Sequence, residues 1–226
     1  MLTNSIENKK MNKVFFPFSY CFVAQTQYED HYKYKDELIT YIKKYDKENK
    51  VDSSDIIASQ IKHNVAESRR ELDFLVQATI SPVPHLVAFL ENAITELYFE
   101  LWRQRRNKDK ITNGKANITE SWYHITKTGG YHDQHTHTRS SFSGIYFIDV
   151  NECGPKNGCI RFWKPYDTTS PDGDIGLHWA HLDLIDHQPT NGQVIIFPGF
   201  LPHSAIPYYG KSDRIVIGFN ATIRPC

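Results

Sequence analysis

Three histidines and one arginine are the residues of this chain whose types and spacing could carry chemistry. His135 and His137 lie two positions apart, and His203 and Arg214 follow far downstream. On an extended segment, side chains two positions apart point to the same side, so His135 and His137 could share a metal ion with a third imidazole brought in by folding. Arg214 opens an apolar run that we expect to be buried, and a buried guanidinium needs an anionic partner. The pattern predicts a non-haem metal site beside an anion clamp.

Each of these residues also has a structural explanation. The histidines could be polar loop residues, because the pair Gly129-Gly130 just before them is typical of a turn. Arg214 could form an internal ion pair with Asp213. Asp133 would share the face of His135 on an extended segment and could be a metal ligand in place of His137. Imidazole suits iron, zinc, copper and nickel alike, so the residues alone do not select the metal.

The elements that must position these residues fall into two halves. Apolar residues at helical spacing predict helices over residues 34–50, about 64–75, and 84 to about 106. An apolar run over 14–24 predicts a buried first strand, rather than a secretion signal. From residue 118 onward, the sequence consists mainly of short runs of β-branched and aromatic residues. These runs predict strands over 118–126, 143–150, 159–163, 193–197 and 214–223.

Consecutive strands without intervening helices predict a β-sandwich or barrel, with the helices packed outside as a brace. We expect a single domain over 1–226, in which 1–117 is mainly helical support and 118–226 is an all-β core, α+β overall. The segment 164–188 is long for a connection between strands, and is predicted to help shape a substrate pocket.

Composition narrows the function classes. The formal net charge is zero, which gives no electrostatic reason to expect nucleic acid or an anionic membrane as partner. Four cysteines without C-x-x-C spacing fit a reducing compartment, so we expect a cytoplasmic protein. No apolar stretch is long enough to span a bilayer. The oligomeric state is left open.

The order of the motifs resembles the iron(II)/2-oxoglutarate-dependent oxygenase superfamily, over roughly residues 118–223. The resemblance is closest to a branch with H-x-H in place of H-x-D/E. It rests on these segments in this order: Gly129-Gly130-Tyr131, His135-x-His137, Ser143-Gly144-Ile145-Tyr146-Phe147-Ile148, Asn157-Gly158-Cys159-Ile160-Arg161-Phe162, Gly192 to Pro198, His203 and Arg214. The resemblance implies a double-stranded β-helix, which is a jelly-roll, cupin-like fold.

The resemblance also implies roles for single residues. His135 and His203 would bind Fe(II), and Arg214 would hold the distal carboxylate of the cosubstrate 2-oxoglutarate. His137 stands where most of the superfamily has Asp or Glu. We rank a three-histidine site first, a site completed by Asp133 second, and an open position of the kind a halogenase needs last. Further candidates for contact with the cosubstrate are His124, Ser143 and Asn220.

The implied activity is oxidation of an unactivated C–H bond with 2-oxoglutarate and O2, with hydroxylation of a small polar substrate such as an amino acid or biosynthetic intermediate as the first expectation. Two alternatives stay open. One is a three-histidine metal dioxygenase that does not use 2-oxoglutarate. The other is a non-catalytic β-helix module that binds a metal or ligand. Three histidines also describe a hydrolytic zinc site.

Overall fold

The structure is a computed structural model, and it describes residues 12–15, 21–48, 62–67, 74–103, 113–137, 139–165 and 184–226. Most of the segment 164–188 lies outside the described residues. The described helices are α1 (His31–Glu48), α3 (Phe74–Gln77) and α4 (Pro82–Arg103). The described strands are β1 (Asn12–Phe15), β2 (Phe22–Gln27), β3 (Lys62–Glu67), β4 (Gly114–His135), β5 (Phe142–Asp149), β6 (Ile160–Trp163), β7 (Leu184–His187), β8 (Gln193–Pro198), β9 (His203–Tyr208) and β10 (Arg214–Pro225).

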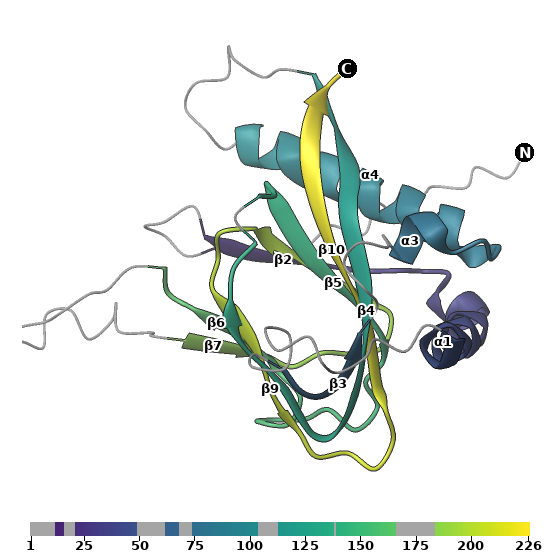
Figure 1. The fold of residues 1–226 in the computed structure, drawn as a ribbon. Helices are drawn as coiled ribbons and strands as arrows, with labels where there is room; N and C mark the ends of the chain where they lie inside the picture. Colours follow the sequence, from purple (N-terminus) through teal and green to yellow (C-terminus); the bar gives the residue numbers. More distant parts are fainter. Residues whose placement is uncertain are drawn as a thin grey trace, which may run out of the picture.

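The strands form one antiparallel sheet that folds over on itself (Figure 1). Their order is β1-β2-β8-β5-β10-β4-β9-β6-β7, and β3 also pairs with β4. Phe162 of β6 packs edge-on against Phe197 of β8, with ring centroids 5.0 Å apart, although these strands are far apart in the sheet order. The two halves of the sheet therefore face each other, and apolar side chains such as Ile195 and Val216 fill part of the space between them.

Strand β4 belongs to both halves of the sheet. Its first part pairs with β10, from Gly114 to Thr126, and its end pairs with β9, where His135 lies opposite His203. Between these parts Gly129 adopts a φ of 79°, a conformation that glycine reaches without the penalty paid by other residues. The predicted turn at Gly129 is thus a bend within a strand, through which β4 crosses from one half to the other.

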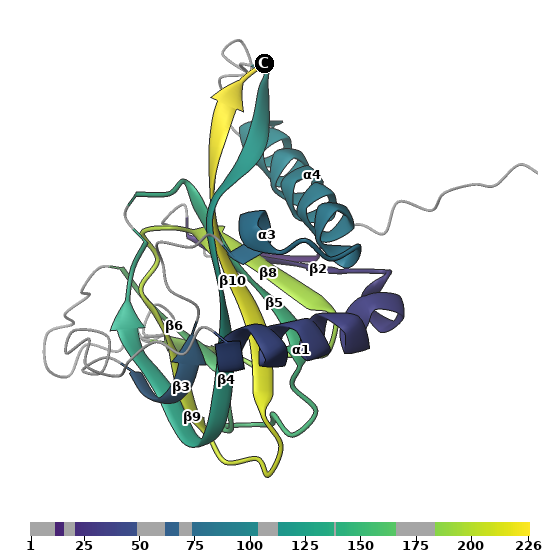
Figure 2. The ribbon, with the colours of Figure 1, turned by 45° about the vertical axis from the view of Figure 1, so that its right-hand side comes forward.

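The helices cover the outer face of the sheet, as the turned view in Figure 2 shows for α1 and α4. Helix α4 buries Leu86, Leu90, Ala93, Ile94 and Leu97, whose spacing puts them on one side of the helix. Two side chains of α4 also bind the start of β4. Thr95 Oγ1 accepts from the amide of Ala116 at 3.0 Å, and Glu91 Oε1 accepts from the amide of Ile118 at 3.2 Å.

The predicted fold class is confirmed, since an all-β core carries helical support. The predicted helix over 64–75 is wrong in its first part, because Lys62–Glu67 is strand β3. At its end Phe74 and Leu75 are in helix α3, and positions 68–73 lie outside the described residues. The segment is rich in residues that favour helices, but pairing with β4 overrides this local preference. The predicted first strand over 14–24 divides between β1 and β2, which pair with each other. Strands β3, β7 and β9 were not predicted.

Candidate metal centre

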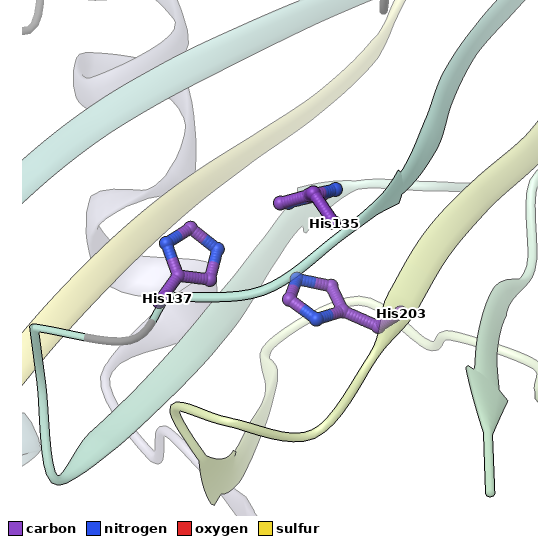
Figure 3. Close-up of side chains that lie close together, drawn as sticks. All are labelled: His135, His137 and His203. Atoms are coloured by element: carbon purple, nitrogen blue, oxygen red, sulfur yellow. The ribbon is translucent and has the colours of Figure 1, made fainter. Parts of the chain in front are cut away.

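Three imidazoles converge where β4 and β9 lie side by side. One ring nitrogen each from His135, His137 and His203 lies within 4.8 Å of the others. Figure 3 shows the three rings turned toward a common point, with His203 on its strand and His137 on the connection that follows β4. The ring centroids of His135 and His203 are 4.3 Å apart, and that of His137 is 5.0 and 5.1 Å from them. This spacing suits three ligands of one ion.

Hydrogen bonds orient two of the three rings. Nδ1 of His135 lies 2.8 Å from the backbone carbonyl of Asp133, and Nδ1 of His203 lies 3.0 Å from that of Leu201. Since a carbonyl only accepts, each Nδ1 carries the proton, and each Nε2 is left with a lone pair for a metal. The sequence places both acceptors two residues before the histidine, so the local backbone itself selects the tautomer.

The environment of His203 keeps this imidazole neutral. His203 is buried, and burial lowers its pKa to about 3, with a further lowering by the nearby His135. The hydrogen bond to Leu201 acts in the opposite direction and is the weaker influence. Metal ligation requires the neutral ring, so His203 is ready to bind an ion without first losing a proton at neutral pH.

A bulge in β4 brings a fourth histidine to the same cavity. The register of β4 with β9 shifts between His132 and His135, so three steps along β4 correspond to two along β9, from Ala205 to His203. His132 therefore faces inward with His135, and their rings stack with centroids 4.0 Å apart at an interplanar angle of 20°. His132 is buried. Strict alternation along an extended segment placed His132 on the opposite face, so sequence reasoning missed it.

Arg214 lies in the same cavity with its charge unbalanced by a carboxylate. It is 2% exposed, and its Nε and Nη2 atoms have no hydrogen-bond partner among the described residues. Burial lowers the pKa of the guanidinium, an effect that the neighbouring Cys153 thiol partly opposes. Asp213, the internal partner that the sequence offers, is paired with Lys43 at 3.0 Å instead. Two buried N–H donors that face a cavity are suited to a carboxylate ligand.

One cavity joins the imidazoles to Arg214. It encloses about 450 Å³, part of which is open to solvent. Alternation along β4 and β10 supplies one wall, because Trp122 and His124 face the cavity while Tyr123 and Ile125 face the apolar core. No carboxylate is among the described residues that line the cavity. These are Trp122, His124, His132, His135, His137, Ser143, Gly144, Ile145, Ile160, Phe197, His203, Ser204, Ala205, Arg214, Val216, Gly218 and Phe219.

A glycine makes room for the aromatic side chain of this wall. A Cβ at Gly218 would lie 2.5 Å from the indole of Trp122, so only glycine allows this close approach. The indole in turn stacks on the ring of His137, with centroids 5.3 Å apart and an interplanar angle of 20°. Gly218 and Trp122 lie opposite each other in the β4–β10 register. This pairing could not be predicted from the sequence, because it depends on how the two strands are aligned.

Two of the predicted candidates lie outside the cavity. Asp133 is exposed and is not part of the group of three imidazoles. Asn220 is buried next to Ser143 but does not line the cavity. Its amide oxygen accepts from Ser143 Oγ at 2.7 Å, and its amide nitrogen donates to Glu120 at 2.6 Å. His124 and Ser143, the other two candidates for cosubstrate contact, do line the cavity.

Comparison with known proteins bears on the β-rich half. Residues 120–220 match the model of a family described as "Putative 2OG-Fe(II) oxygenase". This half of the chain resembles that family. The match spans the three imidazoles and Arg214, and confirms the resemblance inferred from the order of the motifs. No curated protein sequence matches the chain.

Solved structures are similar in fold. A prolyl-4-hydroxylase from Pseudomonas putida has a TM-score of 0.52 at 14% identity, over 88% of this chain and 91% of that one. HygX from Streptomyces hygroscopicus, solved with nickel and 2-oxoglutarate, has a TM-score of 0.56 at 10% identity, over 88% and 82%. SnoN, a non-haem α-ketoglutarate-dependent epimerase from nogalamycin biosynthesis, has a TM-score of 0.58 at 10% identity, over 88% and 75%. Likeness at this identity shows the fold, and confirms the predicted jelly-roll.

Among the described helices, none is long and apolar enough to cross a membrane.

Proposed function

We propose that this chain is a single-domain, non-haem iron(II)- and 2-oxoglutarate-dependent oxygenase that hydroxylates a C–H bond of a small polar substrate. One observation carries the proposal: three imidazoles that could share an ion lie in one cavity with a buried guanidinium whose Nε and Nη2 have no partner among the described residues. The family match over residues 120–220 supports the same reading.

His135, His137 and His203 would hold the iron. The donor set fits, because two of the rings already present Nε2 as the ligand atom and burial keeps His203 neutral. Three imidazoles on a ferrous ion leave coordination positions for a chelating cosubstrate and for O2. Asp133, exposed and outside the group, is the less suitable third ligand.

Arg214 would hold the distal carboxylate of 2-oxoglutarate. A guanidinium offers two parallel N–H donors to a carboxylate, and this one is desolvated, which strengthens the pairing. The charges of the dipositive ion and the dianionic cosubstrate would cancel, because the three imidazoles are neutral, and Arg214 would leave the group with one positive charge. His124 and Ser143 line the same cavity as Arg214 and would contact the cosubstrate.

When bound, iron and 2-oxoglutarate would together activate O2 to oxidise a C–H bond, and the residues of the chain would set where this happens. Trp122 and the other residues that line the cavity would hold the substrate and exclude water, and would so orient one carbon toward the metal. The similar solved structures include a hydroxylase and an epimerase, so the outcome at that carbon needs its own measurement.

An anaerobic titration tests the proposal. Iron(II) is added to the purified chain, followed by 2-oxoglutarate, and the visible absorption is recorded. We expect a charge-transfer band that saturates with the cosubstrate, and release of succinate when O2 is admitted with substrate. Iron binding without any such band would overturn the use of 2-oxoglutarate and favour a three-histidine dioxygenase. Binding of zinc in preference to iron, with no oxygen consumed, would favour a hydrolytic or binding role.

A further inference from the structure

His137 is the member of the triad that the sheet does not hold. Strand β4 ends at His135, and His137 lies on the connection beyond it, as Figure 3 shows. Its main chain is nevertheless fully engaged. The amide of His137 donates to the carbonyl of Gly199 at 2.7 Å. The carbonyl of His137 accepts from both the amide and the hydroxyl of Ser140, at 3.2 and 3.0 Å. Gly199 and Ser140 thus replace the missing strand partner.

The contact at Gly199 joins two parts of the metal centre. Gly199 belongs to the turn between β8 and β9 that leads to His203. A Cβ at this position would lie 2.4 Å from the carbonyl of Ser140 and 2.5 Å from that of His137. Only glycine permits this approach. The connection that carries His137 is therefore packed directly against the turn that precedes His203.

The hydroxyl of Ser140 is itself held by a chain of hydrogen bonds from β10. Glu120 accepts from the amide nitrogen of Asn220 at 2.6 Å, and a carboxylate cannot donate, so the amide oxygen of Asn220 must face Ser143. That oxygen accepts the proton of Ser143 at 2.7 Å.

The proton of Ser143 is thereby committed to Asn220. Ser140 Oγ lies 3.1 Å from Ser143 Oγ and 3.0 Å from the carbonyl of His137. Because Ser140 has a single hydroxyl proton, it serves these two acceptors by sharing that proton in a three-centre hydrogen bond. The hydroxyl of Ser140 thus bridges the main chain of His137 to a pair of side chains buried between β5 and β10.

We propose that Ser140 is a positioning residue for His137, whose hydroxyl ties the main chain of this third imidazole to the Ser143–Asn220 pair and so keeps the ring directed at the metal. The proposal rests on the proposed function only in taking His137 as a ligand. Asn220 and Glu120 would then act as the outer members of this chain of hydrogen bonds, and not by contact with the cosubstrate.

Cobalt(II) is a suitable probe, because its visible absorption reports the number and arrangement of its ligands. The affinity for cobalt(II) alone is measured by calorimetry and the spectrum is recorded for Ser140→Ala, Ser140→Thr and wild type. We expect Ser140→Ala to weaken binding about tenfold, as losses of groups that orient ligands typically do, and to change the cobalt spectrum. Ser140→Thr keeps the hydroxyl, and should restore both.

Two further variants serve as control and as a second test. Ser141→Ala is the matched control, because Ser141 is exposed and its hydrogen bonds to other described residues are made by its backbone. Glu120→Gln alters the far end of the chain of hydrogen bonds at an exposed position, and should weaken cobalt binding in the same direction by a smaller factor. Unchanged affinity and spectrum in both Ser140→Ala and Glu120→Gln would overturn the proposal.

A reference variant separates this failure from a failure of the proposed function. His137→Ala should itself weaken cobalt binding and change the spectrum. If His137→Ala behaves as wild type, His137 is not a ligand, and the metal centre proposed above is wrong. If His137→Ala loses affinity while Ser140→Ala does not, the metal centre stands and only the positioning role of Ser140 is rejected. Thermal unfolding of each variant verifies that it is folded.

Discussion

At the scale of single residues, His137 would decide the charge of the proposed metal centre. The described residues lining the cavity include five histidines and one arginine and no carboxylate. Because the imidazoles are neutral, the charge of a bound dication could be neutralised only by a further, anionic ligand of the ion. A site of this kind should prefer a dianionic ligand more strongly than a site that already contains an aspartate.

His137→Asp tests this preference. We expect the variant to bind iron(II) but to bind 2-oxoglutarate about tenfold more weakly, because a fixed negative charge then opposes the dianion at close range. The anaerobic charge-transfer titration measures both steps. Asp133→Asn is the control and should bind iron(II) and 2-oxoglutarate as the wild type does. Loss of iron binding in Asp133→Asn would instead identify Asp133 as the third ligand.

Arg214, which lines the same cavity, provides a complementary prediction. Arg214→Ala should raise the dissociation constant of 2-oxoglutarate by on the order of 100-fold, since about two hydrogen bonds to a charged group are lost. Iron(II) affinity in the absence of cosubstrate should be unchanged. Arg139→Ala is the matched control, because Arg139 is exposed and outside the cavity. Equal affinity in wild type and Arg214→Ala would refute the role of the guanidinium as clamp.

At the scale of elements, the turn between β5 and β6 packs against Arg214. Gly158 in this turn has a φ of 66°, and a Cβ there would meet Cys153 Sγ at 2.8 Å, the ring of Tyr208 at 3.0 Å and Cδ of Arg214 at 3.4 Å. The turn is itself fixed to the β9–β10 connection, because Glu152 accepts from the amide of Ser212 at 3.0 Å. Arg214 is therefore held from outside the cavity as well as from β10.

Gly158→Ala should disturb both stability and cosubstrate binding. We expect a loss of about 1–3 kcal/mol in the free energy of unfolding, because alanine is strained at positive φ and crowds its neighbours. A weaker affinity for 2-oxoglutarate should accompany it. Gly154→Ala, in the same turn, is the control, since nothing lies within 4 Å of a Cβ at Gly154. Denaturant unfolding and the anaerobic titration report the two effects, and matching behaviour of both variants would contradict the assignment.

Whether a residue or strand could be predicted from the sequence depended on how its secondary-structure element is paired. Residue type and order predicted that His135, His137, His203 and Arg214 lie together, and all four line one cavity, as do the predicted candidates His124 and Ser143. His132 could not be predicted there, because its direction depends on a bulge that only pairing with β9 creates. Strand β3 was predicted as helix for the same reason, since its partner β4 lies far away in the chain. Local sequence patterns predicted most of the helices and strands, whereas the direction of His132 and the conformation of β3 depend on pairing between segments far apart in the chain.

At the scale of the whole molecule, helices and sheet share one apolar core. Leu38 and Ile42 of α1 and Leu90 of α4 are fully buried in the same cluster as Tyr146, Ile217 and Phe219 of the sheet. The hydroxyl of Tyr123 also donates to Asp46 of α1 at 3.0 Å. The helical half thus supports the outer face of the strands whose inner face forms the cavity, and we expect both halves to unfold together.

Leu90→Ala tests this coupling. Truncation of a fully buried leucine should cost about 2–5 kcal/mol in the free energy of unfolding. Helical and strand amides should lose protection against hydrogen exchange by the same factor, measured residue by residue. Val76→Ala is the control at an exposed apolar position and should change little. Loss of protection confined to the helices would show that the β core is stable alone, and would contradict a single domain over 1–226.

The stack of Trp122 on His137 gives this protein a built-in optical signal. The indole ring lies against an imidazole proposed to bind the ion, so a paramagnetic ion at that point should quench its fluorescence. Loading and removal of the metal could then be followed in real time on the unlabelled protein, with Trp122→Phe identifying the emitting residue. The same contact that shapes the cavity wall would make its occupancy visible.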